Sequence, residues 1–293
     1  VTQAEDAKQT IEALNAERPD WLIVDHYGLD IKWEQFLRPH VDKIMVIDDL
    51  ANRYHDCDVL LDQNYSLLGE KRYGDLTPIT CKQLLGPRYA LLRPEYLAHR
   101  KTLRVRNGEV KRVLVFFGGS DLQNMSTIAL QALSHPEMRH LEVDIVVGTN
   151  NPNRLILDEL AKARTRTWIH GPRHHLADLM SQADLAIGAG GTTTWERMCL
   201  GLPTVVVSLA DNQRPASEAL AQAQLILYAG YFADLNTEKL EHLVQGLIQD
   251  AAKLAELSML NKLQVDGLGA SRLVEIMNPS AAHKFLLRPS CEE

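Results

Sequence analysis

Short apolar runs alternate with amphipathic helical segments through most of the chain, and this alternation restricts the fold more than any other feature. In the second half, the runs at residues 112–119, 142–150, 185–191 and 203–209 lack the strict in-and-out pattern of a half-exposed strand. Continuous apolar runs suit parallel strands that are covered on both faces. Because helical segments separate the strands, the sequence predicts an α/β fold built from two Rossmann-like domains.

The boundary between these domains is predicted near residues 95–112. The stretch EYLAHRKTLRVRNGEVKR is polar and basic, and its Asn-Gly pair marks a turn. We therefore expect an N-terminal domain over residues 1–100 and a C-terminal domain over residues 108–278. About three strands precede this linker and about five follow it, so the second domain is the fuller Rossmann-like unit.

The N-terminal domain opens on a helical segment, residues 2–17, rather than on a strand. A doubly wound domain ordinarily begins with a strand and a glycine-rich turn. The first residue is Val1 and not a methionine. We therefore interpret the N-terminal domain as incomplete, and we expect about one further β-α-β unit before Val1.

Composition and charge exclude several classes of partner. The chain of 293 residues has a formal net charge of −7, which argues against a large nucleic-acid surface. No run approaches the roughly 20 apolar residues of a membrane span. The four cysteines are scattered without a CxxC or CxxH pair, so neither a zinc site nor a disulfide framework is indicated. We expect a cytoplasmic protein with reduced thiols, no metal or other cofactor, and no nucleic-acid or membrane partner.

The stretch GAGGTTTWE contains the strongest candidate site. Gly191 follows an apolar strand, and Thr192, Thr193 and Thr194 surround the start of the next helix. Amide groups and hydroxyls at such a position can hold a phosphate. Glu196, about one turn into the helix, can accept hydrogen bonds from a ribose diol. The alternative is an ordinary helix N-cap with a glutamate that complements the helix dipole, and the two interpretations carry about equal weight.

Two further loops follow predicted strands. FFGGSD places Gly119 and Ser120 at a strand end, where they can contact a phosphate or a sugar. LADNQ places Asn212 and Gln213 at another strand end, and their amides suit sugar hydroxyls or N-acetyl groups. The alternatives are a tight turn in the first loop and a helix cap in the second.

Candidate acid–base residues come from the N-terminal domain. His26 and Tyr27 follow the strand WLIV, where either could transfer a proton or orient a substrate; packing in the core or exposure in a loop is the alternative. Asp48 and Asp49 end another strand, and we favour hydrogen bonding to a substrate, or capping, over metal binding for them. The loop within residues 170–180 holds three histidines and could present backbone groups to a base or be a plain polar loop.

In combination, these motifs resemble a known family. IVDHYG, IDDLANRYHDCDVLLDQN, GPRYALLRPEY, FFGGSD, GAGGTTTWE, GLPTVVVSLADNQ and VDGLGASRL occur in the same order in the PseG hydrolases, which act on UDP-2,4-diacetamido-2,4,6-trideoxy-β-L-altropyranose in pseudaminic acid biosynthesis. The resemblance covers about residues 18–275. It implies a MurG-like GT-B arrangement of the two domains, with UDP held mostly by the C-terminal one.

The resemblance also implies an activity and a binding site. The family hydrolyses the glycosyl C–O bond with inversion and without a metal, as water attacks the anomeric carbon. Residues 191–194 would hold the diphosphate, and Glu196 would accept hydrogen bonds from the ribose hydroxyls. Gly119 and Ser120 would line the phosphate and sugar.

Further roles follow from the same resemblance. Asn212 and Gln213 would contact the sugar, the backbone near Leu176 would meet uracil, and Tyr27 would lie beside the sugar. The family's candidate base is a histidine in a G-x-G-H turn after its first strand, and this chain contains no such motif. His26 and Tyr27 are therefore the only catalytic candidates we assign here, and we expect the chain taken alone to have little activity.

Three alternatives remain open. A MurG-like glycosyltransferase would use the same UDP site, and a non-catalytic nucleotide-sugar binding protein would need no base. Residues 284–293, KFLLRPSCEE, resemble the first strand of a GNAT acetyltransferase and predict a fused acetyltransferase domain. An ordinary polar tail is the other interpretation of that segment.

Overall fold

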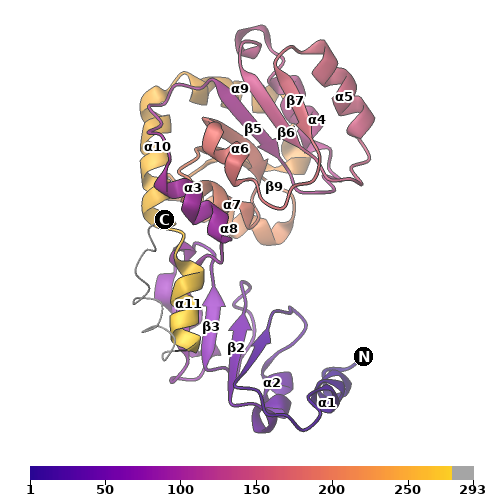
Figure 1. The fold of residues 1–293 in the computed structure, drawn as a ribbon, viewed down its shortest axis with the longest axis vertical. Helices are drawn as coiled ribbons and strands as arrows, with labels where there is room; N and C mark the ends of the chain where they lie inside the picture. Colours follow the sequence, from indigo (N-terminus) through magenta and orange to yellow (C-terminus); the bar gives the residue numbers. More distant parts are fainter. Residues whose placement is uncertain (279–293) are drawn as a thin grey trace, which may run out of the picture. The chain divides into compact units, whose positions relative to one another are not determined.

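The computed structural model describes residues 1–278, which fold into two compact units. The first unit comprises residues 1–91 together with the described residues from Leu268, and the second comprises Leu92–Gly267. Figure 1 traces both units along the chain. The segment 284–293, predicted to begin an acetyltransferase domain, lies outside the described residues.

The first unit is built on a parallel four-stranded sheet with strand order β1-β2-β3-β4. Thr2 begins the opening helix with a capping box, in which its hydroxyl accepts from the Glu5 amide and Glu5 bonds back to the Thr2 amide. Ile44, Val46 and Leu60 of the sheet pack with apolar residues of α1 and α2. The elements are α1 (Gln3–Ala13), β1 (Trp21–Val24), α2 (Ile31–Leu37), β2 (Lys43–Ile47), β3 (Val59–Asp62) and β4 (Lys82–Leu85).

The last described helix, α11 (Gly269–Met277), also belongs to the first unit. Its residue Leu273 packs with Met45 and Leu61 of the sheet. The indole N–H of Trp21 donates to the carbonyl of Met277 at 2.9 Å. The chain therefore returns to the first unit after completing the second.

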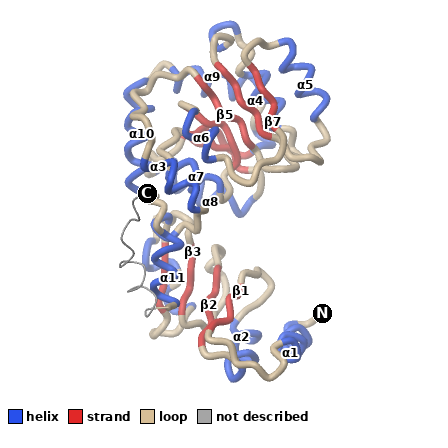
Figure 2. Tube along the Cα trace, viewed as in Figure 1, coloured by secondary structure: helices blue, strands red, loops and turns tan. Residues whose placement is uncertain are grey.

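The second unit contains a parallel six-stranded sheet with strand order β10-β9-β8-β5-β6-β7. In Figure 2 its strands form a layer with helices around it. The helices α6, α7 and α8 each contact strands of this sheet. Its elements are α3 (Pro94–Lys101), β5 (Arg112–Phe116), α4 (Met125–Ala132), β6 (Glu142–Val146), α5 (Arg154–Ala163), β7 (Thr167–His170), α6 (Ala177–Gln182), β8 (Leu185–Ala189), α7 (Thr193–Cys199), β9 (Thr204–Ser208), α8 (Arg214–Gln222), β10 (Leu227–Tyr231), α9 (Thr237–Ile248) and α10 (Ala251–Gln264).

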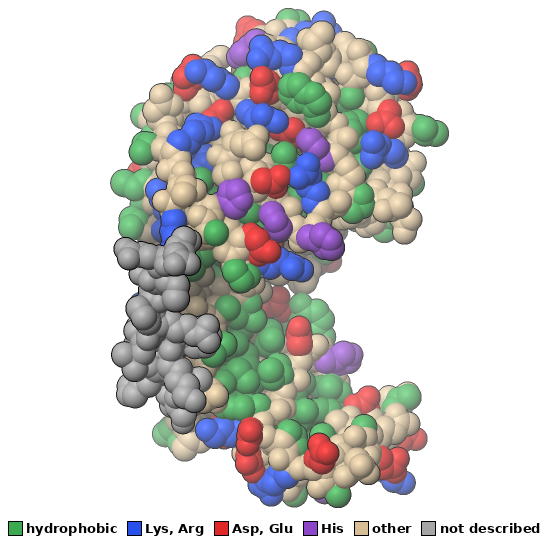
Figure 3. Space-filling model, in the orientation of Figure 1, with side chains coloured by type: hydrophobic (Ala, Val, Ile, Leu, Met, Phe, Trp, Pro, Cys, Tyr) green, Lys and Arg blue, Asp and Glu red, His purple; other side chains and the backbone are tan. Residues whose placement is uncertain are grey.

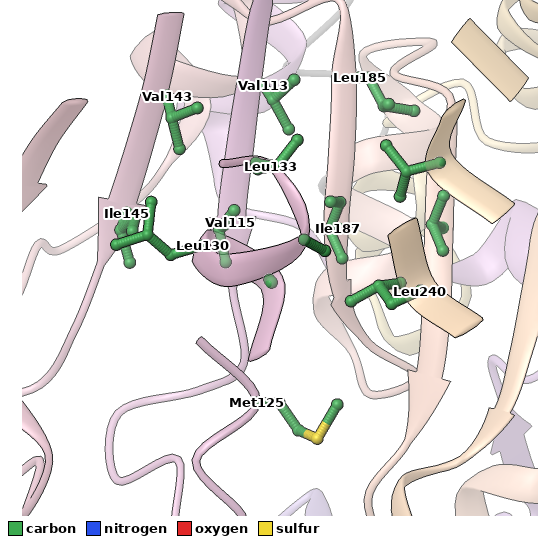
Figure 4. Packing of buried hydrophobic residues seen from close by; sticks show 14 of the residues in the cluster. Val113, Val115, Met125, Leu130, Leu133, Val143, Ile145, Leu185, Ile187 and Leu240 are labelled. Atoms are coloured by element: carbon green, nitrogen blue, oxygen red, sulfur yellow. The ribbon is translucent and has the colours of Figure 1, made fainter. Parts of the chain in front are cut away.

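A continuous apolar core fills one face of this sheet. Val113 of β5 is in register with Val143 of β6 and with Leu185 of β8, so these side chains lie on the same face. Figure 4 shows them packed with Leu130 of α4 and Leu240 of α9. This packing fixes β5 and β8 side by side, and the loops that follow these two strands therefore lie close together.

The predicted α/β class with parallel sheets is confirmed, but the domain boundaries differ from those predicted from the sequence. The segment 95–112 is docked to the second unit, because Arg100 donates to the carbonyls of Cys199 and Lys262 at 2.6 and 2.7 Å. The strands β4 and β10 were not recognised in the sequence. Both are edge strands, and β4 begins on an exposed lysine while β10 contains Gly230 at a break in the pairing register.

Candidate functional site

A pocket lies at the carboxyl ends of the strands in the second unit. The chain runs from β5 to β6 on one side of the sheet, whereas β8 pairs with the opposite edge of β5, so the strand order reverses at β5. Ligands of open α/β sheets bind where the order reverses in this way. The pocket has a volume of about 210 Å³ and is lined by Tyr96, Phe116, Gly119, Val146, Val147, Gly148, Pro172, Arg173, His174, His175, Leu176, Thr193 and Glu196.

The size of the pocket suits one part of a ligand rather than a whole nucleotide sugar. Pockets for drug-sized ligands enclose roughly 300–1,000 Å³, which exceeds this volume. Four of the predicted site residues line it, namely Gly119, Leu176, Thr193 and Glu196. These residues come from two separate loops and from α7, so the fold brings them together from distant parts of the sequence.

Glu196 is the acidic group of the pocket, and Tyr96 holds it in place. The buried Tyr96 hydroxyl accepts a hydrogen bond from the Leu176 amide at 3.2 Å and donates one to Glu196. Burial raises the pKa of Glu196, although the bond from Tyr96 and the positive charges nearby oppose this rise. The carboxylate is thus fixed at the pocket wall, and it can accept hydrogen bonds from a ligand.

The turn between β8 and α7 contains two adjacent glycines, Gly190 and Gly191, before the threonines. A Cβ on Gly190 would collide with the Ser217 hydroxyl, so this glycine permits α8 to pack closely. A Cβ on Gly191 would meet only ordinary contacts. Among the described residues, no hydrogen bond uses the N–H groups of Gly191, Thr192 or Thr193. The turn therefore carries amide donors, as expected for a phosphate-binding loop.

The loop after β5 is held by the loop after β6. The amide of Gly148 donates to the carbonyl of Gly119 at 2.9 Å, and a Cβ on Gly148 would collide with that carbonyl. Nothing lies within 4 Å of a Cβ built on Gly119. Asp121, buried in the same loop, accepts hydrogen bonds from the first amides of α4, so its carboxylate caps this helix.

Several predicted residues do not line this pocket. Thr194 is buried, and its hydroxyl accepts a hydrogen bond from Arg197 at 2.9 Å. Gln213 uses its side-chain oxygen to accept from the Leu209 amide at 2.9 Å. Ser120 and Asn212 have exposed side chains in loops that follow β5 and β9. Thr192 is exposed in the turn before α7, and its hydroxyl makes no capping bond.

The two catalytic candidates lie in the first unit, after β1. His26 accepts a hydrogen bond from the Gly28 amide through Nδ1 at 3.0 Å and is exposed. The side chain of Tyr27 is 57% exposed. Asp48, in contrast, is buried and pairs with Arg53 at 2.8 Å, while it also accepts from the Tyr73 hydroxyl. Asp48 thus makes its contacts within the first unit, and hydrogen bonding to a substrate stays a prediction for it.

A polar chain supports the pocket loop that follows β7. The guanidinium of Arg173 donates to Nδ1 of His170 at 3.4 Å, and Nε2 of His170 lies 2.7 Å from Asp144. Because arginine can only donate, Nδ1 of His170 is the acceptor and its Nε2 carries the proton toward Asp144. Burial raises the pKa of Asp144, but Arg112 and His170 outweigh burial and hold it below its usual range.

Tyr96 and Arg173 are the pocket residues with polar side chains that were not singled out from the sequence. Tyr96 lies in the segment interpreted as a linker, and only its aromatic character within a polar stretch could have indicated a buried role. Arg173 lies in the histidine-rich loop already noted as a candidate, between Gly171 and His174. Figure 3 shows basic, acidic and histidine side chains mixed on one face of the second unit.

Two negative observations apply to the part of the chain that the structure describes. Within residues 1–278, no group of three or more His, Cys, Asp or Glu side chains is arranged to hold a metal ion. Over the same residues, no helix is both long enough and apolar enough to cross a membrane.

Comparison with known proteins agrees with this fold. An uncharacterized protein of Methanocaldococcus jannaschii is 27% identical over 259 residues, which cover 86% of this chain and 51% of the relative. The chain therefore spans about half the length of that protein. The Campylobacter jejuni UDP-2,4-diacetamido-2,4,6-trideoxy-β-L-altropyranose hydrolase is 25% identical over 221 residues, covering 75% of this chain and 77% of the hydrolase.

Among solved structures, MurG of Acinetobacter baumannii matches with a TM-score of 0.64 and 14% identity, covering 94% of this chain and 78% of MurG. The UDP-GlcNAc 2-epimerase of Neisseria meningitidis, bound to UDP-GlcNAc, matches with a TM-score of 0.62 and 14% identity, covering 95% and 81% of the two chains. These matches confirm two Rossmann-like units of the kind found in GT-B enzymes.

The family match falls on the part of the chain that forms the pocket. The model of the glycosyltransferase family 28 C-terminal domain matches residues 113–271, which is more than half of the chain. All pocket residues except Tyr96 lie within these limits. The chain therefore belongs to the family defined by the glycosyltransferase family 28 C-terminal domain.

Proposed function

We propose that this chain binds a UDP-linked sugar through the pocket of the second unit. The observation that supports this most is the Glu196 carboxylate, fixed by Tyr96 at the point of the sheet where the strand order reverses. In this assignment Glu196 accepts hydrogen bonds from the ribose hydroxyls, and the amides of residues 191–193 bind the diphosphate. The uracil contacts the backbone near Leu176.

We further propose that the reaction is hydrolysis of a UDP-2,4-diacetamido-2,4,6-trideoxy hexose, as in the Campylobacter jejuni relative. Water attacks the anomeric carbon, the bond from that carbon to the diphosphate oxygen breaks, and UDP leaves with the bonding electrons. A base accepts the proton of the water. His26 and Tyr27 remain the candidates for acid–base or orienting roles, and Ser120, Asn212 and Gln213 remain candidates for contacts with the sugar.

A glycosyltransferase activity is the second candidate, because the matching family is defined on glycosyltransferases and MurG shares the fold. Calorimetric titration of the full chain with UDP tests the binding site first. Incubation with the UDP-linked diacetamido sugar, followed by separation of the products, then tests the reaction. Free sugar with UDP supports hydrolysis, a glycosylated acceptor supports transfer, and unchanged substrate in the presence of UDP binding contradicts both activities for this chain.

A further inference from the structure

A row of charged and titratable side chains crosses three neighbouring strands of the second unit. Arg112 of β5 donates to the Asp144 carboxylate of β6, through Nε at 2.5 Å and through Nη2 at 3.1 Å. Nε2 of His170, the last residue of β7, lies 2.7 Å from the same carboxylate. Asp144 is 1% exposed, so this buried acid joins the arginine of one neighbouring strand to the histidine of the other.

This row lies on the face of the sheet that leads to the pocket. Side chains two residues apart on a strand point to the same face, so Phe116 shares the face of Arg112 and Val146 shares the face of Asp144. Val146 is in register with His170 of β7. Phe116 and Val146 both line the pocket. The apolar core in Figure 4 occupies the opposite face, and the polar row therefore ends at the pocket.

Arg173 of the pocket is bound to the end of this row. Its Nη2 donates to Nδ1 of His170 at 3.4 Å, and its Nη1 donates to the Asp178 carboxylate at 2.8 Å. A guanidinium carries five N–H donors. Within the part of the chain that the structure describes, these two bonds leave three donors of Arg173 for a ligand. The side chain is 35% exposed and lines the pocket, so these donors are accessible there.

The position of Arg173 relates it to one part of the proposed ligand. In the proposed function Glu196 binds the ribose and the amides of residues 191–193 bind the diphosphate, so the uracil faces the loop of residues 171–176. Arg173 belongs to that loop. Uracil presents a carbonyl oxygen at C4, whereas cytosine presents an amino donor there. Because a guanidinium only donates, it can bond to the uracil oxygen and would face a second donor in cytosine.

We propose that Arg173 determines base specificity by donating to a carbonyl oxygen of uracil, and that His170 is the positioning residue that holds its guanidinium. This inference rests on the proposed function. Asp144 accepts the Nε2 proton of His170 and so keeps Nδ1 an acceptor for Arg173. Arg112 holds Asp144 from the other side. The row across the sheet thus fixes one tautomer of the imidazole, and the imidazole fixes the arginine at the pocket.

Calorimetric titration of the full chain with UDP and with CDP tests the specificity. The wild type should bind UDP about tenfold more tightly than CDP, the effect of one hydrogen bond from a charged donor. In Arg173→Gln the ratio of the two affinities should approach one, because an amide can donate to uracil or accept from cytosine. Arg166→Gln is the matched control, since Arg166 donates to Glu142 at 2.8 Å outside the pocket, and it should keep the wild-type ratio.

The positioning role has its own variants. His170→Phe keeps a ring but removes both nitrogens, so the ratio of UDP to CDP affinity should fall as in Arg173→Gln. His170→Gln supplies an acceptor for Arg173 and a donor for Asp144, and it should restore part of the ratio. A general loss of structure would weaken both nucleotides alike and leave the ratio unchanged. Adding His170→Phe to Arg173→Gln should not lower the ratio further.

Two simpler probes separate the base from the phosphates. Arg173→Gln should weaken the binding of uridine and leave the binding of inorganic pyrophosphate unchanged; weaker pyrophosphate binding would show a phosphate contact and overturn the role in base specificity. If UDP binds with the same UDP-to-CDP ratio in wild type and Arg173→Gln, the proposed function stands and the role of Arg173 is overturned. An unchanged ratio in His170→Phe overturns the positioning role alone. If the wild type binds no UDP, the proposed function fails and this inference fails with it.

Discussion

Removal of the Tyr96 hydroxyl tests how the pocket wall is held. In Tyr96→Phe the ring keeps its buried packing, but the Leu176 amide loses its acceptor at 3.2 Å and Glu196 loses a donor. An unsatisfied buried amide costs about 1–3 kcal/mol, and a hydrogen bond to a charged group contributes about 1.5–3 kcal/mol. Because the 3.2 Å bond is long and Glu196 is only partly buried, we expect the free energy of unfolding to fall by about 2 kcal/mol.

The same substitution should weaken ligand binding. Glu196 without its donor is free to rotate and is more readily protonated, so we expect UDP affinity to drop about tenfold, or ~1.4 kcal/mol. Urea unfolding and calorimetric titration measure the two effects separately. Tyr228→Phe is the matched control, because its hydroxyl donates to Ser208 at 3.0 Å in the same unit but outside the pocket. It should lose stability without losing affinity. Wild-type affinity in Tyr96→Phe would refute the role assigned to this hydroxyl.

Three further changes have defined outcomes. Gly148→Ala should lower the melting temperature and the UDP affinity together, because the new Cβ collides with the Gly119 carbonyl. Gly119→Ala has open space around its Cβ and should lower the melting temperature little. Equal losses of melting temperature in the two variants would contradict this expectation. Burial raises the pKa of Asp62 from 3.8 to about 6, so folding favours its protonated form. The free energy of unfolding should therefore fall by about 3 kcal/mol as the pH rises from about 4 to about 6. Urea unfolding at several pH values should show a flatter dependence on pH in Asp62→Asn. The sulfurs of Cys57 and Cys81 lie 3.5 Å apart, so glutathione disulfide should oxidise them to a disulfide and remove two titratable thiols, and Cys81→Ser should prevent this.

The parts of the site that depend on local chemistry could be predicted from the sequence. A phosphate-binding turn can be recognised within about ten residues, from glycines and threonines that follow a strand and an acidic residue one turn later. Gly119, Thr193 and Glu196 accordingly line one pocket, together with Leu176, which only the family resemblance had indicated. The sheet brings these separate loops together, because parallel strands have their carboxyl ends at the same edge wherever they lie in the sequence.

The features that were missed depend on contacts between distant residues. Tyr96 lies 100 positions before Glu196 in a polar segment, and nothing in that segment encodes the bond between them. The helix α11 follows the second unit directly in sequence, yet its apolar side chains complete the core of the first. Thr194 shares its residue type with Thr193 but faces a buried arginine, because successive helical residues point in different directions.

The glycines of the site differ in ways that the sequence pattern does not predict and that the packing around them explains. Gly190 and Gly191 are adjacent and chemically identical, but a Cβ on Gly190 would collide with the Ser217 hydroxyl, whereas a Cβ on Gly191 would make only an ordinary contact with Gln213. In the neighbouring loops a Cβ on Gly148 would collide with the Gly119 carbonyl, while a Cβ on Gly119 would meet open space. Each contact thus uses one glycine to bring two backbone segments together and leaves another beside the pocket unobstructed. A glycine pair in the sequence predicts that such a loop exists, and only the packing around it decides which glycine can approach a ligand.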